Sequence, residues 1–466
     1  MLIDYLNHNP DLPQNTLKKR LCFLAISMGL FASLYPGSFF GLCGLSILLL
    51  YLHQISRFWN DRWPFRLFLI GFIPRLLIIS LLYFYSPPSA YKVTMFGDSD
   101  FNFWMSEQAF YALLGNIDYR AASLSPGLYG YNILPWIYGA LYLLLGYSPF
   151  LIMIINTTMS CLTAWVVFLI TYKITQHRTA AAWAMGFTIL SPSQILWSVN
   201  LLKEPVIELI LAVIVYLFVV MIQERKWYYL IIITLLTYML GQLRINLHYL
   251  VLAALGLSAF LFIPRRLITG ILFLIVILTA LVFHRKPSRI IDEYRNFQVE
   301  IIAIQMGNIT TGGTYYKFIP DRYQPGASNN SPMTLSEMAL SYLKALYYYL
   351  CSPNPFQDVT LNKIPALPQM FLWYFLLIFF FPVGTLYLLR YHFRSSGIIF
   401  IYLLVLTSGL AFFTGNEGTA FRQRDILTPF FFIPIAVGMI NTLGWLTRRA
   451  GPPAPSSANE PSKQEN

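Results

Sequence analysis

Charged residues are scarce in this sequence, and their scarcity excludes an ordinary soluble protein. Only 11% of the 466 residues are Asp, Glu, Lys or Arg, whereas soluble domains carry about 25%. Hydrophobic residues make up 57% of the chain and aromatic residues 17%. Apolar runs of about 15–22 residues recur along most of its length, as in proteins with several membrane-spanning helices. The strands of a membrane barrel alternate every second residue, so we predict an all-α polytopic membrane protein instead.

Cysteines and signature motifs are also scarce. Of the four cysteines, Cys22, Cys43 and Cys161 lie in apolar runs and Cys351 has no neighbouring cysteine, so we expect no disulfide framework. The sequence has no Gly-rich phosphate loop, no dinucleotide fingerprint and no serine-nucleophile elbow. No set of Cys and His residues has zinc spacing. The candidates for chemistry are therefore the few charged residues at the ends of apolar runs.

The net charge of +12 would indicate nucleic-acid binding in a soluble protein. In a membrane protein it indicates basic cytoplasmic loops, together with cations that can meet an anionic lipid or phosphate. We therefore expect the membrane and an anionic lipid as partners, and no nucleic acid.

Basic residues also orient the chain. Lys18, Lys19 and Arg20 place the N-terminus in the cytoplasm. The tail 450–466, rich in Pro, Ser and Ala, is expected to be disordered and cytoplasmic. The bacterial inner membrane and the endoplasmic reticulum are both open as locations, and the lack of a retention signal favours the bacterial inner membrane. We predict about twelve spans with both termini inside, at 21–34, 38–54, 67–85, 150–171, 180–198, 204–222, 228–241, 247–263, 267–283, 369–389, 397–413 and 427–446.

The first large external segment, 86–149, contains a helix that we expect to lie along the membrane surface. Residues 132–147 and 150–171 are both apolar enough to cross, but the basic turn 173–178 that follows them should be cytoplasmic. An odd number of crossings is needed to reach that side, so one run does not cross. Because 132–147 is short and rich in Trp and Tyr, we assign it as an interfacial helix.

This topology divides the chain into a transmembrane core, an external segment and C-terminal membrane helices, at 1–284, 285–366 and 367–449. The segment 285–366 is too long for a bare connector, so we expect an external loop or a small lid subdomain. Four polar clusters fall on the external face: Asp98 with Asp100, Lys203 with Glu204, Arg244 with His248, and Arg422 with Arg424 and Asp425.

Asp98 and Asp100 follow an apolar span and precede a helix that is predicted to run to about Leu114. One interpretation is structural, because Asp98 or Ser99 can cap that helix and an acid there suits the helix dipole. The other is chemical, because a carboxylate at a membrane surface can accept a proton from a substrate. The residues alone leave both interpretations open.

The other clusters also have two interpretations each. Glu204 precedes Pro205, which can open a helix, so Lys203 and Glu204 could simply mark a helix start. An acid beside a base at membrane depth, however, usually has a function. The external arginines could anchor at lipid headgroups or bind a lipid phosphate bidentately. We take four cations as candidates for phosphate binding: Arg422, Arg424, Arg244 and Lys203.

Three stretches resemble a known family: Gly97-Asp98-Ser99-Asp100 with the helix after it, the segment from Gly146 through Pro192 to Glu204, and Arg422 to Pro429. They resemble the GT-C superfamily of integral-membrane glycosyltransferases, in the branch of protein O-mannosyltransferases and aminoarabinose transferases. In that family an external loop starts with an acidic motif and a helix, and an interfacial helix and a second external acid follow. The second acid of the first motif is displaced here to Asp100.

The resemblance implies transfer of a sugar from a polyprenyl-phosphate donor to a hydroxyl of a lipid, glycan or protein, on the extracytoplasmic face and with inversion. Asp98 or Asp100 would be the general base, and Glu204 would position the acceptor or the sugar. The arginines would neutralise the leaving phosphate. Some family members use a divalent metal, which the three acids could hold, although their spacing does not require one.

Two other functions compete with this expectation. An O-antigen-type polymerase or ligase would depend more on the external arginines than on Asp98. A lipid or polysaccharide transporter would place charges near the middle of spans and would contain discontinuous helices. The charges of this sequence gather mostly at the ends of the predicted spans, which favours the transferase.

Overall fold

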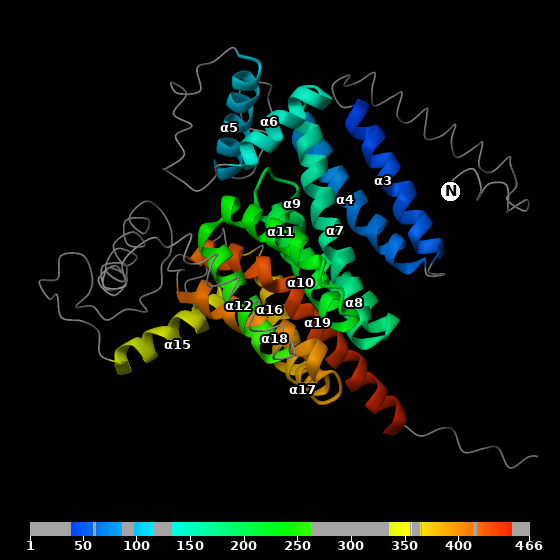
Figure 1. Ribbon diagram of the computed structural model, residues 1–466, viewed down its shortest axis with the longest axis vertical. Coiled ribbons are helices and arrows are strands. Elements are labelled where there is room, and N and C mark those ends of the chain that lie inside the picture. Colours follow the sequence, from blue (N-terminus) through cyan, green and yellow to red (C-terminus); the bar gives the residue numbers. More distant parts are fainter. Residues whose placement is uncertain are drawn as a thin grey trace, which may run out of the picture. The chain divides into compact units, whose positions relative to one another are not determined.

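The computed structural model describes residues 39–58, 62–85, 97–115, 133–262, 335–354, 356, 364, 366–412 and 417–449. Every regular element in these ranges is helical, which confirms the predicted all-α class (Figure 1). The predicted spans 21–34 and 267–283, the tail 450–466 and most of the external segment 285–366 lie outside the described residues.

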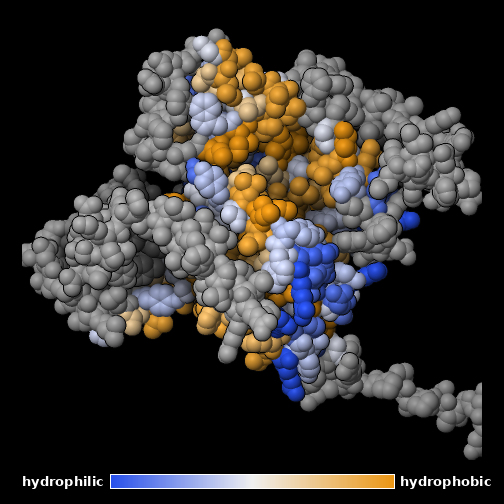
Figure 2. Space-filling view, in the orientation of Figure 1, coloured by the Kyte–Doolittle hydropathy of each residue, from blue (hydrophilic) through white to orange (hydrophobic). Residues whose placement is uncertain are grey.

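Seven of the described helical stretches are long and apolar enough to cross a membrane, and the chain is therefore a multi-pass membrane protein. Large apolar side chains also cover much of the described surface, as expected for contact with lipid (Figure 2). The predicted span 228–241 is a helix of only 15 residues, α11 (Tyr229–Leu243). The seven stretches are Trp63–Tyr83, Pro149–Thr175, Glu204–Glu224, Ile245–Phe262, Leu367–Tyr391, Phe393–Ala411 and Glu417–Gly444.

The predicted span 180–198 is not one continuous helix. The chain forms two shorter helices there, α8 (Arg178–Leu190) and α9 (Pro192–Ser198). Ser191, between them, has φ −58° and ψ 123°, which is not helical. The residue before a proline is disfavoured in the helical conformation, so Pro192 accounts for the break.

The final predicted span begins ten residues too late. The helix α19 (Glu417–Arg449) starts at Glu417 instead of near residue 427, so Arg422, Arg424 and Asp425 lie inside a helix and not in a loop. The polar stretch Glu417–Asp425 lowers the hydropathy and so resembles a loop. Four of its polar side chains, Glu417, Gln423, Arg424 and Asp425, are nevertheless buried, which lets the helix continue through them.

The described residues group into two compact units. The first draws on Met1–Cys161 and Ile195–Val206, and the second on Leu162–Gln194 and Ile207–Asn466. The first unit contains α3 (Phe39–Phe58), α4 (Trp63–Tyr85), α5 (Gly97–Leu113), α6 (Leu134–Leu145) and the first half of α7 (Pro149–Thr175).

In the first unit α5 packs against α6 (Figure 1). A Cβ atom at Gly139 would lie 2.8 Å from the backbone nitrogen of Phe110, so the two helices approach closely at that glycine. The 12 residues of α6 cover about 18 Å, well short of a hydrocarbon core of about 30 Å. Its length therefore suits the predicted interfacial position.

The second unit contains α8 and the helices from α10 (Glu204–Glu224) onward, apart from the first turn of α10. In it α12 (Ile245–Phe262) packs against α18 (Phe393–Phe412), and α15 (Leu335–Cys351) packs against α18 and α19. The stretch Leu367–Tyr391 consists of α16 (Leu367–Phe375), a π-helical turn η4 (Leu376–Phe380) and α17 (Phe381–Tyr391). The extensive contact in this unit between α17 and α19 centres on Gly384 and Gly438.

Candidate functional site

The first turn of α5 carries both predicted acids. Asp98 is exposed and Asp100 is half-buried. Ser99 between them is buried, and its Oγ accepts a hydrogen bond of 2.7 Å from the backbone N–H of Leu201. Because α5 begins at Gly97, the acids lie within the helix and not before it, and their charge lies at its positive end.

The turn that follows α9, residues 198–204, accepts hydrogen bonds from side chains of two helices of the first unit. On α7, Thr157 Oγ1 donates to Ser198 O over 3.0 Å, and Asn156 Nδ2 donates to Asn200 O over 2.6 Å. From α5, Asn102 Nδ2 donates to Leu201 O over 2.9 Å. The first turn of α5 therefore lies against the segment that leads into Lys203 and Glu204.

Both residues at the end of that turn are buried. Glu204 is the first residue of α10 and is 1% exposed, and Lys203 is 9% exposed and so does not extend to the surface. Burial raises the pKa of the Tyr138 hydroxyl well above its usual value, and the nearby Glu204 carboxylate raises it further. The first unit thus places Tyr138 close to Glu204 as a hydroxyl that stays protonated. Sequence reasoning missed Tyr138, which looks like one more interfacial aromatic.

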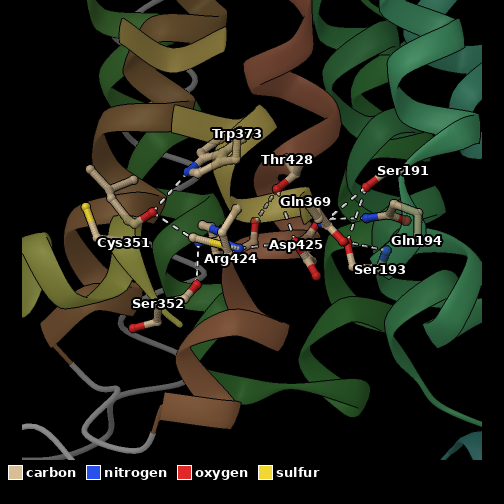
Figure 3. Close-up of polar contacts among 12 residues, drawn as sticks. Ser191, Ser193, Gln194, Cys351, Ser352, Gln369, Trp373, Arg424, Asp425 and Thr428 are labelled. Carbon is tan, nitrogen blue, oxygen red and sulfur yellow. Dashed lines mark hydrogen bonds and ion pairs between the residues drawn. The ribbon is translucent and has the colours of Figure 1, made fainter. Parts of the chain in front are cut away.

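Arg424, one of the predicted cations, makes several buried contacts. Its Nη1 donates to Ser352 O over 2.6 Å and to Leu350 O over 3.0 Å, at the end of α15 (Figure 3). The guanidinium carbon lies 5.3 Å from the centre of the Trp373 ring and 5.0 Å from that of Phe421, within cation–π range. The expectation of a phosphate ligand in an external loop is not supported, because these contacts bury the side chain to 1% exposure.

Two neighbours of Arg424 also bind the end of α15. Trp373 Nε1 donates to Leu350 O over 3.0 Å, and the Tyr374 hydroxyl donates to Cys351 O over 2.7 Å. The last carbonyl groups of a helix have no partner within it, so these side chains act as a cap that is supplied by α16 and α19. We call Trp373, Tyr374 and Arg424 the α15 cap.

Arg244 and Arg422 have different surroundings. Arg244 follows α11, and its backbone N–H donates to Leu240 O over 2.8 Å. Burial raises the pKa of the Tyr349 hydroxyl, whereas Arg424 and Arg244 oppose the rise, which places both cations near Tyr349. Arg422 is half-buried on α19. His248 Nδ1 forms a hydrogen bond of 2.7 Å with Thr237 O, so His248 has a structural contact within the second unit.

The structure adds buried polar groups that sequence reasoning missed. In the second unit, Gln194 Nε2 donates to Asp425 O over 2.8 Å (Figure 3). It also donates to Glu208 Oε1 over 3.2 Å. In the first unit, Arg75 is fully buried within α4. The statement that charges gather at span ends is therefore wrong for Arg75, Glu208 and Asp425. A charge within an apolar run was the signal that could have identified Arg75 and Glu208.

The possible metal site has no counterpart in the described part of the chain. Among those residues, no three His, Cys, Asp or Glu side chains lie close enough together to hold an ion. Asp98, Asp100 and Glu204 thus do not form a metal-binding group in this conformation. What remains in the first unit is a set of carboxylates with different exposure, on two segments that hydrogen bonds join.

A scan against protein-family models finds no match, and a search of curated proteins finds none either.

Proposed function

We propose that this protein is a membrane glycosyltransferase of the GT-C type. It moves a sugar from a polyprenyl-phosphate donor to an acceptor hydroxyl on the extracytoplasmic face of a bacterial inner membrane. The observation that supports this most is the contact between the first turn of α5 and the turn at Leu201, through Ser99 and Asn102. It holds an exposed acid, Asp98, in the same unit as a buried acid, Glu204.

In the proposed reaction Asp98 accepts the proton of the acceptor hydroxyl as the acceptor oxygen forms a bond to the anomeric carbon. The bond from that carbon to the phosphate oxygen breaks, and the lipid phosphate leaves with its electron pair. Attack from the opposite side inverts the configuration. A positioned general base typically contributes about 10²–10⁴-fold to such a step. Asp98 is preferred over Asp100 as the base because it is the more exposed of the two.

In this proposal Lys203, in the same unit as Asp98 and Glu204, is the cation for the leaving phosphate, and Arg244 and Arg422 of the second unit stay candidates from the sequence alone. A guanidinium can bind two phosphate oxygens at once. Arg424 is reassigned to holding the end of α15, because both of its Nη1 hydrogen bonds go to carbonyl oxygens. Glu204 would position the acceptor or the sugar.

The test is turnover by the purified protein in lipid vesicles. We would measure release of polyprenyl phosphate from a panel of polyprenyl-phosphate sugars with wild type, Asp98→Asn and Asp100→Asn. We expect Asp98→Asn to lower the rate about 10²–10⁴-fold. Glu107→Gln, a matched substitution farther along α5, should keep the wild-type rate. Loss of turnover in Asp100→Asn alone would move the base by two residues, and no turnover with any donor would refute the transferase.

A transporter remains the second candidate, and one observation favours it. Glu208 and Asp425 are buried in candidate spans, α10 and α19. The helical segment before α10 is interrupted at Ser191, between α8 and α9. Transporters place ionisable groups and broken helices within the membrane. Movement of a labelled lipid-linked sugar across vesicles without release of its phosphate would favour this function. A polymerase or ligase would instead keep its activity in Asp98→Asn and lose it when the external arginines are replaced.

A further inference from the structure

Arg75 is a charged residue where the sequence offers least reason for one. It lies in the candidate span α4, in the apolar run Gly71-Phe-Ile-Pro-Arg-Leu-Leu, and its side chain is 0% exposed. On scales of membrane insertion, an arginine at the centre of a helix costs about 2.5–3.5 kcal/mol. Such a residue usually faces the interior of the helix bundle and has a function there.

The contacts of Arg75 lead to the turn that carries Glu204. Its Nη1 donates to Gly71 O within α4 over 2.9 Å, and its Nε donates to Ser198 Oγ over 2.9 Å. Ser198 Oγ in turn donates to Ile195 O over 2.9 Å. The guanidinium therefore fixes the last residue of α9, where the chain leaves the helix toward Lys203 and Glu204.

The residues beyond Ser198 continue the same network. The carbonyl oxygens of Ser198, Asn200 and Leu201 accept hydrogen bonds from Thr157, Asn156 and Asn102. Asn156 also accepts from the Tyr138 hydroxyl over 3.4 Å, and Tyr138 lies near Glu204. These side chains, Arg75 included, are buried. Among the described residues of the first unit, Glu204 is the one buried carboxylate, since Asp98 is exposed and Asp100 and Glu107 are half-buried.

We propose that Arg75 is a positioning residue that holds the Ser198–Glu204 turn in place for the transfer reaction. This role rests on the proposed function. Arg75 touches neither substrate nor reacting atoms in this account. It acts through Ser198, whose position sets where α10 and its first residue, Glu204, begin. A displacement of about 1 Å in a catalytic arrangement can lower the rate about 100-fold.

The experiment has two readouts on the full-length protein in lipid vesicles. Hydrogen exchange, followed by mass spectrometry, reports the protection of residues 198–203 without any need for activity. Turnover of a polyprenyl-phosphate sugar reports kcat and the donor KM. The variants are Arg75→Gln, Arg75→Lys and Ser198→Ala. The matched control is Arg66→Gln, the same change at an exposed arginine of α4.

For Arg75→Gln we expect exchange at 198–203 to become at least about tenfold faster, while the middle of α7 stays protected. We expect kcat to fall about 10–100-fold with the donor KM unchanged within about threefold. Arg75→Lys should be intermediate, because its ammonium keeps the charge and can donate but lacks the planar guanidinium that bonds Ser198 Oγ and Gly71 O together. If Arg75→Gln does not fold, Ser198→Ala carries the test, because it keeps the arginine and removes only the Ser198 hydroxyl, which accepts from Arg75 and donates to Ile195 O.

Three outcomes would overturn the inference. Exchange at 198–203 that stays at the wild-type rate in Arg75→Gln and Ser198→Ala would show that Arg75 does not hold the turn. Faster exchange with wild-type kcat would show that the turn takes no part in the reaction, and so would a rise in donor KM with unchanged kcat. Wild-type protein without turnover would refute the proposed function instead, and the exchange measurement would still decide whether Arg75 holds the turn.

Discussion

At the scale of single residues, Arg422 and Arg424 lie two positions apart on α19 and have different surroundings. Arg422 is half-buried, whereas Arg424 is buried, lies within cation–π range of two aromatic rings and is hydrogen-bonded to the end of α15. Side chains two positions apart on a helix point in different directions, so neighbours in sequence can meet different partners. The sequence alone predicts the same role, phosphate binding, for both arginines. Their contacts in the structure give them different roles.

We expect Arg424→Gln to destabilise the protein more than Arg422→Gln, which changes a half-buried side chain. Losing the Arg424 guanidinium removes a donor from the Ser352 carbonyl, at about 1–3 kcal/mol, whereas Leu350 O keeps its hydrogen bond from Trp373 Nε1. Thermal unfolding in detergent measures the difference, with Arg422→Gln as the matched control. An Arg424→Gln protein that unfolds at the wild-type temperature but binds donor weakly would return Arg424 to the phosphate site.

Only part of the site could be predicted at this scale. Asp98, Asp100 and Glu204 stand out because acids are rare in an apolar chain, and the structure joins their two segments through Ser99 and Asn102. The partners of Arg424 lie 72 and 74 residues away in the sequence. Hydropathy and charge carry no information about such pairings, because packing between helices decides them.

At the scale of helices, α17 and α19 meet at a pair of glycines. A Cβ atom on Gly384 would lie 1.8 Å from Pro434 O, and one on Gly438 would lie 2.0 Å from Phe380 O. Both contacts are to backbone atoms, which cannot turn aside as a flexible side chain can. Small residues that allow close approach of two backbones are a common basis of helix pairing in membranes.

We therefore expect Gly438→Ala to destabilise the second unit, by about 1–3 kcal/mol or more, because α17 must move away. Gly444→Ala on the same helix is the matched control, since a Cβ atom there would meet nothing within 4 Å. That substitution should be neutral or stabilise by up to about 1 kcal/mol. Equal unfolding temperatures for the two variants in detergent would show that the helices do not touch at Gly438.

The sequence predicts the helices with clear ends better than those that contain polar residues. Gly146, with φ 91°, ends α6, and Pro149 opens α7, so this junction was predicted closely. The start of α19 was not, because Glu417–Asp425 is polar in sequence and yet largely buried in the fold. The break at Ser191 was missed although Pro192 is its cause, because the apolar run continues across it.

At the scale of the whole molecule, the length of α6 predicts which segments lie on the same side of the membrane. If α6 does not cross, the exposed residues Leu114 and Tyr147 face the same compartment, and Thr179, beyond α7, faces the other. We would introduce single cysteines at these positions in a protein that lacks its four native cysteines. A membrane-impermeant maleimide should label the first two in intact cells and the third only after permeabilisation. Labelling of Leu114→Cys and Tyr147→Cys from opposite sides would mean that α6 crosses.

The α15 cap also constrains how the protein can be assembled during synthesis. The ribosome makes α15 first, Trp373 and Tyr374 about 20 residues later, and Arg424 about 70 residues later. Until α19 has entered the membrane, Ser352 O has no Arg424 to accept from, and the end of α15 is only partly bonded. A helix that is made later therefore completes an earlier one, and the maturation of this unit waits for α19.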